Sequence, residues 1–325
     1  MRAALYDRFG PADLLRVTEL KRPEPGPGEV RVRVRVSGVN PTDWKTRAGA
    51  PGREMAWPFV VPNQDGAGDI DAVGTGVDPA RVGERVWVYF AQWNRQFGAA
   101  AEWVCLHERQ AVRLPDTASY ELGASLGIPA LTAAYALGAD GGVEGLTVLV
   151  TGGAGAVGHF AIELARRAGA RVVTTVSSPA KAQLAAAAGA DAVVDYRTAD
   201  DLAGAIRDAA GGPIDRIVEV APGNLPFDAG IVAPGGAVVC YAATAEDPTI
   251  PVRTLMTANV LLRFMLIYTV PEAALARAVG EVSAALSDSA LTELPNHVFS
   301  LDQIADAHRA VEEGAVGKVI VDLGR

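Results

Sequence analysis

Three glycines in the middle of the chain have the spacing of a phosphate-binding loop. Gly153, Gly155 and Gly158 form a Gly-x-Gly-x-x-Gly pattern within 148–178, VLVTGGAGAVGHFAIELARRAGARVVTTVSS. Glycine permits a tight turn and lets backbone N–H groups approach a pyrophosphate, and the N-terminus of a following helix favours its negative charge. The pattern therefore predicts a dinucleotide site if it lies between a strand and a helix.

The flanking residues supply that context. The run 146–150 is apolar and typical of a buried strand, apolar residues recur at helical spacing over 157–168, and 170–176 is typical of the next strand. The segment is thus predicted to be a strand–helix–strand unit with the glycines at its first turn.

The residues at the end of the second predicted strand indicate whether the site suits NAD or NADP. In an NAD-binding unit an acidic residue at this point binds the ribose hydroxyls. No Asp or Glu occurs in 169–190, where the strand ends in Ser177 and Ser178 and Lys181 follows. Hydroxyls and a cation suit a 2′-phosphate, which a carboxylate would repel. Tyr196, at the end of the third predicted strand, could cover that phosphate or the adenine. Together these residues predict NADP(H), although singly Lys181 is typical of a surface lysine and Tyr196 of a strand-end aromatic.

Two kinds of pattern divide the chain. The first ~120 residues are rich in short alternating segments, of which EVRVRVRVSGV at 29–39 has valines on one face and arginines on a face predicted to be solvated. From about Leu122, strands alternate with helices, which predicts a parallel, doubly wound sheet. The predicted strands are 146–150, 171–176, 192–196, 215–220, 236–243 and 317–323, and the predicted helices are 157–168, 179–188, 199–211, 271–287 and 302–314.

The bulk composition excludes several classes of function. A net charge of -9 argues against a nucleic-acid partner, and no apolar run has the ~18 residues of a membrane span. The N-terminal residues lack the apolar region of a secretory signal, and the two cysteines, Cys105 and Cys240, lie far apart in apolar runs where they are predicted to be buried and reduced. A cytoplasmic protein with no membrane partner is expected.

Several segments, in this order, resemble the medium-chain dehydrogenase/reductase superfamily, in particular the zinc-free quinone oxidoreductases related to zeta-crystallin. The segments that carry the resemblance are GVNPTD (38–43), PNQDGAG (62–68), GERV (83–86), GIPALTA (127–133), the loop 150–158, DYR (195–197) and GKV (317–319). The resemblance implies an α/β protein with a GroES-like β-rich domain, 1–121 and 296–325, that holds the substrate. A Rossmann domain, 122–295, would be inserted between its parts, and the family likeness suggests a homodimer.

The same resemblance places the cofactor. Thr132 is expected near the nicotinamide, although a buried hydroxyl that satisfies a helix turn explains it nearly as well. The loop residues are expected at the pyrophosphate, with Lys318 within reach of it. The predicted NADP(H)-binding residues are Thr132, Gly153, Gly155, Ala156, Val157, Gly158, Ser177, Ser178, Lys181, Tyr196 and Lys318.

The zinc ligands of the related alcohol dehydrogenases are missing. Asp43 occupies the region of the first Cys ligand and Gln64 the place of the His, and two cysteines cannot form a four-Cys site. The four histidines, His107, His159, His297 and His308, are expected on the surface or on helix faces, away from these motifs. No metal is predicted. Without a Lewis acid an unactivated alcohol is hard to oxidise, whereas a quinone or conjugated carbonyl accepts hydride readily.

Asn40 and Asp43 are the candidate catalytic residues. Asn40 can donate to a carbonyl oxygen and Asp43 could order a water or a nearby base, with Lys45 as a further possible donor. Local turn chemistry is an open alternative, because Asn before Pro and Thr-Asp pairs are common in turns and caps.

The predicted function is zinc-independent, NADPH-dependent transfer of hydride to a quinone or another activated carbonyl or alkene. An enoyl reductase acting on 2-enoyl thioesters or polyketide-type substrates is the alternative. It is weakened because Pro51 stands where such members usually carry Tyr. A short-chain dehydrogenase is disfavoured, since no Tyr is followed by Lys four residues on. The non-enzymatic alternative is an NADPH-binding structural or sensor protein.

Overall fold

The computed structural model describes residues 1–50, 52, 54–244 and 246–324, and the chain divides into two compact units. Unit 1 comprises Met1–Ile128 and Pro295–Arg325, and unit 2 comprises Pro129–Leu294. The sequence prediction drew the first boundary after residue 121. In the structure the short helix α2 (Tyr120–Gly123) packs against strands of unit 1, which keeps the following residues with that unit.

Unit 1 is built around a mixed sheet with the strand order β14-β15-β3-β4-β5-β7, in which β6 also pairs with β3, while β1 and β2 form a separate ladder. Its strands are β1 (Arg2–Leu5), β2 (Arg16–Glu19), β3 (Glu29–Val39), β4 (Asp65–Val73), β5 (Arg85–Val88), β6 (Trp103–His107), β7 (Ala111–Arg113), β14 (Asn296–Ser300) and β15 (Lys318–Asp322). The last strand, β15, pairs antiparallel with β3, so that Val319 lies opposite Val39. The predicted return of the chain end to the first part is confirmed.

The arginines of β3 do not all face solvent. Arg31 is only 7% exposed, which makes the prediction of a wholly solvated arginine face wrong. Its Nε atom donates to Asp71 Oδ1 at 2.7 Å, and its guanidinium pairs with Glu24 at 2.9 Å. β4 and β6 pair with β3 on either side at this residue, and the segment before β3 contacts the side chain, since Arg31 Nη1 also donates to Pro23 O at 3.0 Å. Arg33 is exposed, as predicted.

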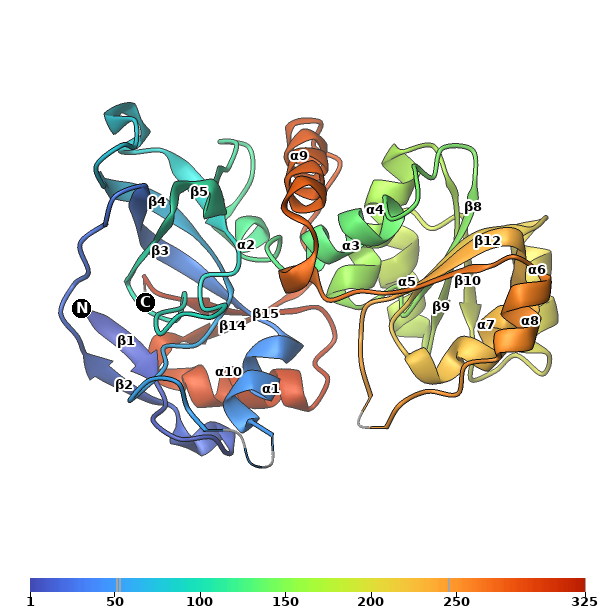
Figure 1. Cartoon of the computed structure of the whole chain (residues 1–325), viewed down its shortest axis with the longest axis horizontal. Coiled ribbons are helices and arrows are strands. Elements are labelled where there is room, and N and C mark those ends of the chain that lie inside the picture. The colour runs from blue at the N-terminus through green and yellow to red at the C-terminus, as the bar shows by residue number, and fades with distance from the viewer. Residues whose placement is uncertain (51, 53, 245, 325) are drawn as a thin grey trace. The chain divides into compact units, whose positions relative to one another are not determined.

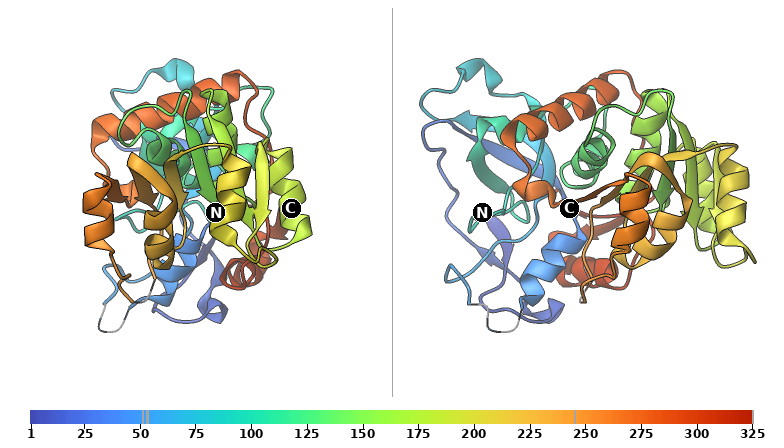
Figure 2. Two further views of the ribbon diagram at one scale, coloured as in Figure 1. Left: turned by 90° about the vertical axis from the view of Figure 1, so that its right-hand side faces the viewer. Right: turned by 45° about the vertical axis from the view of Figure 1, so that its right-hand side comes forward.

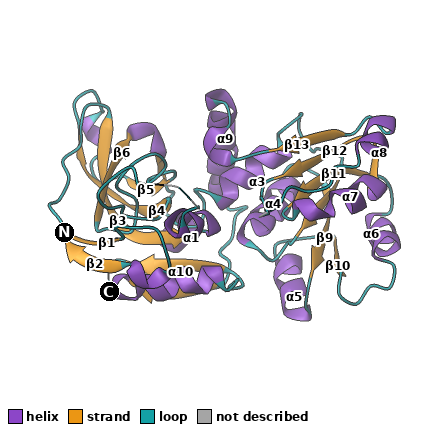
Figure 3. Ribbon diagram, turned by 60° about the horizontal axis from the view of Figure 1, so that its bottom comes forward, coloured by secondary structure: helices purple, strands orange, loops and turns teal. Residues whose placement is uncertain are grey.

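Two helices pack together beside the unit 1 sheet. Figure 3 shows α1 (Pro41–Ala48) next to α10 (Ile304–Glu312), elements from opposite ends of the chain. The helix predicted over 302–314 starts later as an α-helix, because a 3₁₀ turn spans Leu301–Gln303. A core of side chains from β1, β15 and α10 ties α10 to these two strands.

Unit 2 is a doubly wound parallel sheet with the strand order β10-β9-β8-β11-β12-β13. Its strands are β8 (Thr147–Thr151), β9 (Arg171–Val176), β10 (Ala192–Asp195), β11 (Ile214–Glu219), β12 (Val232–Cys240) and β13 (Leu261–Phe264). The order reverses between β8 and β11, which is where ligands bind in such sheets. The predicted fold class, a β-rich domain plus a doubly wound α/β domain, is confirmed.

Helices cover both faces of this sheet, as Figures 1 and 2 show. The helices of unit 2 are α3 (Pro129–Leu137), α4 (Ala156–Arg167), α5 (Pro179–Ala187), α6 (Leu202–Ala210), α7 (Leu225–Ile231), α8 (Val252–Thr257) and α9 (Glu272–Ser287), of which α9 packs on α3 and α4. The helix predicted from residue 199 begins at Leu202, because Asp201 caps it by accepting a 2.9 Å hydrogen bond from Gly204 N. In the described part of the chain, no helix is both long and apolar enough to cross a membrane.

Candidate functional site

The predicted phosphate loop lies between β8 and α4 in unit 2. Gly153 and Gly158 are required there by close packing. A Cβ on Gly153 would lie 2.1 Å from Thr174 Oγ1, and one on Gly158 would lie 2.4 Å from the carbonyl oxygen of Gly152. Gly155, the N-cap of α4, is exposed, and a Cβ there would have only one neighbour within 4 Å, at 3.4 Å. The loop thus leaves space over Gly155, where a ligand could approach the backbone.

The first turn of α4 presents backbone donors beside that space. Ala156 and Val157 are half-buried and follow Gly155 directly. The first amides of a helix have no carbonyl partner within it, and the helix dipole adds positive potential. The arrangement fits the pyrophosphate of a dinucleotide, because an anion there would accept hydrogen bonds from amides that have no partner within the helix.

A basic and hydroxyl-bearing corner lies at the end of β9. Lys181 Nζ donates to Ser177 Oγ at 2.9 Å, and Ser178 caps α5 by accepting from Lys181 N at 3.4 Å. Tyr196 N donates to Val176 O at 3.1 Å, which holds the half-exposed Tyr196 beside the same strand end. The residues predicted to bind the 2′-phosphate are therefore brought together.

Sequence reasoning missed a carboxylate at this corner. Asp195 ends β10 in register with Val176, and its Oδ1 accepts from Arg197 N at 2.9 Å. The exposed Arg197 follows it. The segment DYR (195–197) could have predicted this carboxylate. It ends the strand next to β9, so its first residue must lie near Ser177.

Thr132 lies in unit 2, inside α3. It is 4% exposed, and α3 is buried over almost its whole length. Its proximity to the nicotinamide stays a prediction.

A buried acidic pair stands at the point where the strand order reverses. Glu219, at the end of β11, is 0% exposed, and its Oε1 accepts from Thr151 Oγ1 at 2.9 Å and from Ala221 N at 2.5 Å. Asp228 on α7 is 1% exposed. Burial, followed by the charge of Glu219, raises the pKa of Asp228 to about 8. The sequence analysis did not single out this pair, although an acid inside the apolar strand 215–220 was a visible signal.

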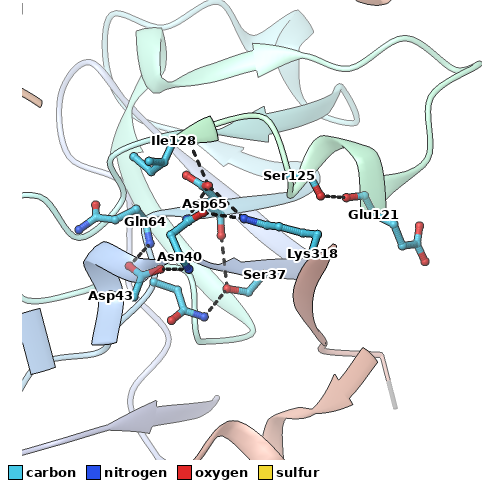
Figure 4. A network of polar contacts seen from close by, with 10 residues as sticks. Ser37, Asn40, Asp43, Gln64, Asp65, Glu121, Ser125, Ile128 and Lys318 are labelled. Atoms are coloured by element: carbon cyan, nitrogen blue, oxygen red, sulfur yellow. Dashed lines mark hydrogen bonds and ion pairs between the residues drawn. The ribbon is translucent and has the colours of Figure 1, made fainter. Parts of the chain in front are cut away.

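Unit 1 contains a second polar cluster, shown in Figure 4. Asn40 Nδ2 donates to Asp65 Oδ2 at 2.7 Å, and Lys318 Nζ donates to Asn40 Oδ1 at 2.7 Å. Asp65 also accepts from Ile128 N at 3.1 Å. Asn40, Asp65 and Lys318 are each at most 2% exposed, so the amide of Asn40 is held at both ends in a buried setting.

Asp43 belongs to the same cluster but is engaged by backbone. Its Oδ2 accepts from Asn40 N at 2.7 Å, as in a capping box, and its Oδ1 accepts from Gln64 N at 3.1 Å. Burial, reinforced by the charge of Asp65, raises the pKa of Asp43 to about 8. Burial also raises the pKa of Asp65 to about 6, against the opposing charge of Lys318.

The donors at the two zinc-ligand positions do not fit zinc. Both oxygens of Asp43 accept backbone N–H groups. The amide of Gln64 exchanges two 3.1 Å hydrogen bonds with Gln92. Across the described residues, no three His, Cys, Asp or Glu side chains are grouped so as to hold a metal ion. Zinc sites are built from several His, Cys or carboxylate ligands that converge on one point, and the described residues contain no such group.

One histidine corrects the sequence analysis. His308 lies on a helix face, as predicted, but it is not remote from the motifs: it is 0% exposed, and its Nε2 lies 3.0 Å from Asn63 Oδ1, one residue before Gln64. Burial, followed by the charge of Arg47, lowers the pKa of His308 to about 3. His308 is therefore a neutral core residue that ties α10 to the loop before β4.

The remaining predicted features divide between confirmed and untested ones. Cys105 and Cys240 are buried and free, as predicted. Lys45 is exposed, with its ammonium 5.8 Å from the Trp44 ring. Pro51, the residue in place of the family tyrosine, lies outside the described residues.

The candidate residues thus fall into two groups. Unit 1 holds Asn40, Asp43 and Lys318. Unit 2 holds Thr132, Gly153, Gly155, Ala156, Val157, Gly158, Ser177, Ser178, Lys181 and Tyr196. The structure gives Lys318 partners in unit 1 that sequence reasoning missed, and its contact with a pyrophosphate stays a prediction.

Comparisons with known proteins identify the family of the chain. Residues 26–116 match the family model of the alcohol dehydrogenase GroES-like domain, and 156–283 match that of zinc-binding dehydrogenases. A quinone oxidoreductase of Rattus norvegicus is 28% identical over 99% of this chain and 98% of its own length. A chloroplast envelope quinone oxidoreductase homolog of Arabidopsis thaliana is 30% identical over 70% of each chain.

A solved structure agrees with these relatives. A mycobacterial protein in complex with NADPH is 30% identical and superposes with a TM-score of 0.84, over 99% of this chain and 100% of that one. Family models, relatives and fold all point the same way, and the chain belongs to the quinone oxidoreductase family of the medium-chain dehydrogenase/reductase superfamily.

Proposed function

We propose that the chain is an NADPH-dependent reductase that transfers hydride to a quinone or another activated carbonyl or alkene, without a metal ion. The observation that carries the proposal is the corner at the end of β9, where Lys181 Nζ donates to Ser177 Oγ at 2.9 Å. No acidic residue occurs in 169–190, at the strand end where NAD-binding units carry one. The mycobacterial relative, solved with NADPH, supports the same cofactor.

The residues of unit 2 would hold the dinucleotide. The first amides of α4, those of Ala156 and Val157, lie next to the open space over Gly155 and suit the pyrophosphate, whereas Gly155 N already donates to Gly152 O at 2.9 Å. Lys181 with Ser177 and Ser178 suits the 2′-phosphate, because a cation and hydroxyls bind a dianion, and the nearby carboxylate of Asp195 is engaged by the backbone N–H of Arg197. The backbone N–H of Tyr196 is held at the same strand end, and its half-exposed side chain can cover the phosphate or the adenine. Bound NADPH supplies the hydride.

In unit 1, Asn40 is the better catalytic candidate of the two. Of the two N–H groups on Nδ2, one donates to Asp65, which leaves the other for a carbonyl oxygen of the substrate. Lys318 fixes the orientation of the amide from its Oδ1 side. The hydrogen bond from Asn40 would stabilise the oxyanion that forms as hydride arrives, and water can supply the proton.

Asp43 is better described as a positioning residue. Both of its oxygens accept backbone N–H groups, from Asn40 and from Gln64, so none is directed at a substrate in this arrangement. Its carboxyl fixes the start of α1, and thereby Asn40.

An assembly of two copies is proposed through the edge of the unit 2 sheet. β13 is the terminal strand in the sheet order, and the large apolar residues Leu261, Phe264 and Leu266 on or next to it are 38%, 51% and 46% exposed. An exposed apolar edge of this kind is a template for pairing with another chain. Sedimentation of the intact protein would test this part separately.

A substrate panel tests the function. Oxidation of NADPH should be fast with 1,4-benzoquinone or 9,10-phenanthrenequinone and slow with crotonyl-CoA, and NADP⁺ should not be reduced by a saturated alcohol. Preference for crotonyl-CoA would favour the enoyl reductase. Tight binding of NADPH without oxidation by any acceptor would favour a non-enzymatic NADPH-binding protein.

A further inference from the structure

A pocket of about 540 Å³ lies within unit 2, in the range of sites for small organic ligands. It is formed by α3, the end of α4, the start of α9 and the segment that leads from α3 toward β8. Its apolar wall consists of Ala134, Leu137, Val143, Leu164, Ala168 and Ala278. None of the residues predicted to hold the dinucleotide lines it, so it is a separate cavity.

Two arginines are among the polar residues that line this pocket. Arg263 of β13 lines it and donates to Tyr135 Oη at 3.1 Å, and Arg277 of α9 lines it as well. Among the described residues, no carboxylate pairs with either guanidinium. The acidic lining residue, Glu281, already pairs with Arg167 at 3.5 Å. With Arg263, Arg277 and Glu281 in its lining, the pocket carries a net charge of +1, and Arg263 has no carboxylate partner among the described residues.

A third arginine, Arg216, lies next to the pocket and has its own counterion. Arg216 is 2% exposed, and its guanidinium donates to Leu137 O at 2.8 Å and pairs with Asp140. Burial lowers the pKa of Arg216, Asp140 opposes this shift, and the nearby charge of Arg263 adds to it. An anion at Arg263 would relieve that repulsion.

We propose that this pocket binds a small amphipathic carboxylate, whose carboxylate is held by Arg263 and Tyr135 with Arg277 adding charge, and whose apolar body lies along the α3, α4 and α9 wall. Guanidinium groups bind carboxylates through paired, charge-assisted hydrogen bonds. The apolar wall selects against free inorganic anions, which have no body to bury. The proposal goes beyond the proposed function, since hydride transfer needs none of these residues.

Calorimetric titration of the full-length protein tests the site. Octanoate serves as the aliphatic probe and 2-naphthoate as the aromatic one, with octanol as the uncharged control. We expect one carboxylate per chain and at least ~10-fold weaker binding of octanol, because a charge-assisted hydrogen bond contributes ~1.5–3 kcal/mol. The probe that binds more tightly identifies the class of ligand body.

Four variants locate the ligand. Arg263→Gln should weaken carboxylate binding at least 10-fold, and Arg277→Gln several-fold. Ala274→Leu, at a half-buried lining position, fills the cavity and should weaken both probes. The matched control is Arg253→Gln, an exposed arginine of α8 that does not line the pocket and should change nothing. The melting temperature of each variant, measured in parallel, separates lost binding from lost folding.

Three outcomes would overturn the proposal. The first is the absence of carboxylate binding to the natural protein. The second is competition by saturating NADPH, which would place the ligand in the dinucleotide site. The third is that Arg263→Gln and Ala274→Leu change the dimer dissociation constant in sedimentation but leave carboxylate binding unchanged, which would make the pocket part of a contact between copies.

Discussion

Lys318 and Asn40 lie 278 positions apart in the sequence and are joined by a 2.7 Å hydrogen bond from the lysine ammonium to Asn40 Oδ1. Lys318 is the first residue of β15, and Asn40 is the cap that precedes α1. Asp65 completes the triangle, 3.8 Å from the ammonium and 2.7 Å from the amide nitrogen. The last strand of the chain therefore orients the proposed substrate-binding amide of the first part.

Replacing Lys318 should destabilise the protein strongly. Lys318→Met leaves the buried carboxylate of Asp65 without its counterion, and removing one partner of a buried pair typically costs ~3–5 kcal/mol. Urea unfolding followed by tryptophan fluorescence measures the change in the free energy of unfolding. Lys21→Met, at an exposed lysine, is the control and should stay within ~0.5 kcal/mol of the natural protein. Equal effects of both variants would disprove a structural role of the Lys318 ammonium.

Chelation should leave the reductase activity unchanged. The oxygens of Asp43 accept backbone N–H groups and the amide of Gln64 is bonded to Gln92, so neither is free to bind zinc. Treatment with 1,10-phenanthroline or EDTA should alter the rate of NADPH oxidation by benzoquinone by less than ~2-fold. Loss of activity that added Zn²⁺ restores would refute the metal-independent part of the account.

Two glycines of the loop should respond differently to alanine. Gly158→Ala places a methyl group 2.4 Å from Gly152 O, so both the stability of the protein and its affinity for NADPH should fall. At Gly155 the nearest atom would be 3.4 Å away, so Gly155→Ala should retain the melting temperature. It should nevertheless weaken the binding of NADPH, because the new methyl group occupies space proposed for the pyrophosphate. Undiminished NADPH affinity in Gly155→Ala would contradict that placement.

The buried carboxyl of Asp228 should make unit 2 less stable as the pH rises. Its pKa is about 8 in the folded chain and ~3.9 in an unfolded one. Because the folded pKa is the higher, the contribution of Asp228 to stability is full below pH ~4, declines as the pH rises, and is lost above pH ~8. The slope between these values is at most ~1.4 kcal/mol per pH unit.

Asp228→Asn should remove this part of the pH dependence. The difference in unfolding free energy between the variant and the natural protein should therefore shift in favour of the variant from pH 6 to pH 8. All five tryptophans lie in unit 1, so circular dichroism is the better probe. The control is Asp208→Asn, at an exposed position of α6. Parallel pH profiles of Asp228→Asn and the natural protein would show that Asp228 is ionised throughout.

Local patterns predicted the architecture well. The strand 171–176 and the helix after Gly155 could be recognised because hydrophobic periodicity and capping act over a few residues. The resemblance of 317–319 to a closing strand predicted that β15 returns to the first part, where it pairs with β3. The corner at Ser177 and Lys181 followed from a rule about strand ends in parallel sheets.

Long-range polar contacts could not be predicted in the same way. The partner of Arg31 is Asp71, 40 positions away, and that of His308 is Asn63, 245 positions away. No periodicity encodes such pairs, because they depend on which strands and helices become neighbours. The same limit applies to Glu219 and Thr151, which meet only because β11 pairs with β8.

The discrimination between NADPH and NADH by Lys181 tests the central claim most directly. The dissociation constants of both dinucleotides would be measured for the natural protein and for Lys181→Ala. The account predicts that the natural protein prefers NADPH. It further predicts that Lys181→Ala raises the dissociation constant of NADPH by about 10-fold or more and that of NADH by less than ~3-fold. The larger change is the equivalent of one charge-assisted hydrogen bond. Equal weakening of both dinucleotides, or a natural protein that prefers NADH, would contradict it.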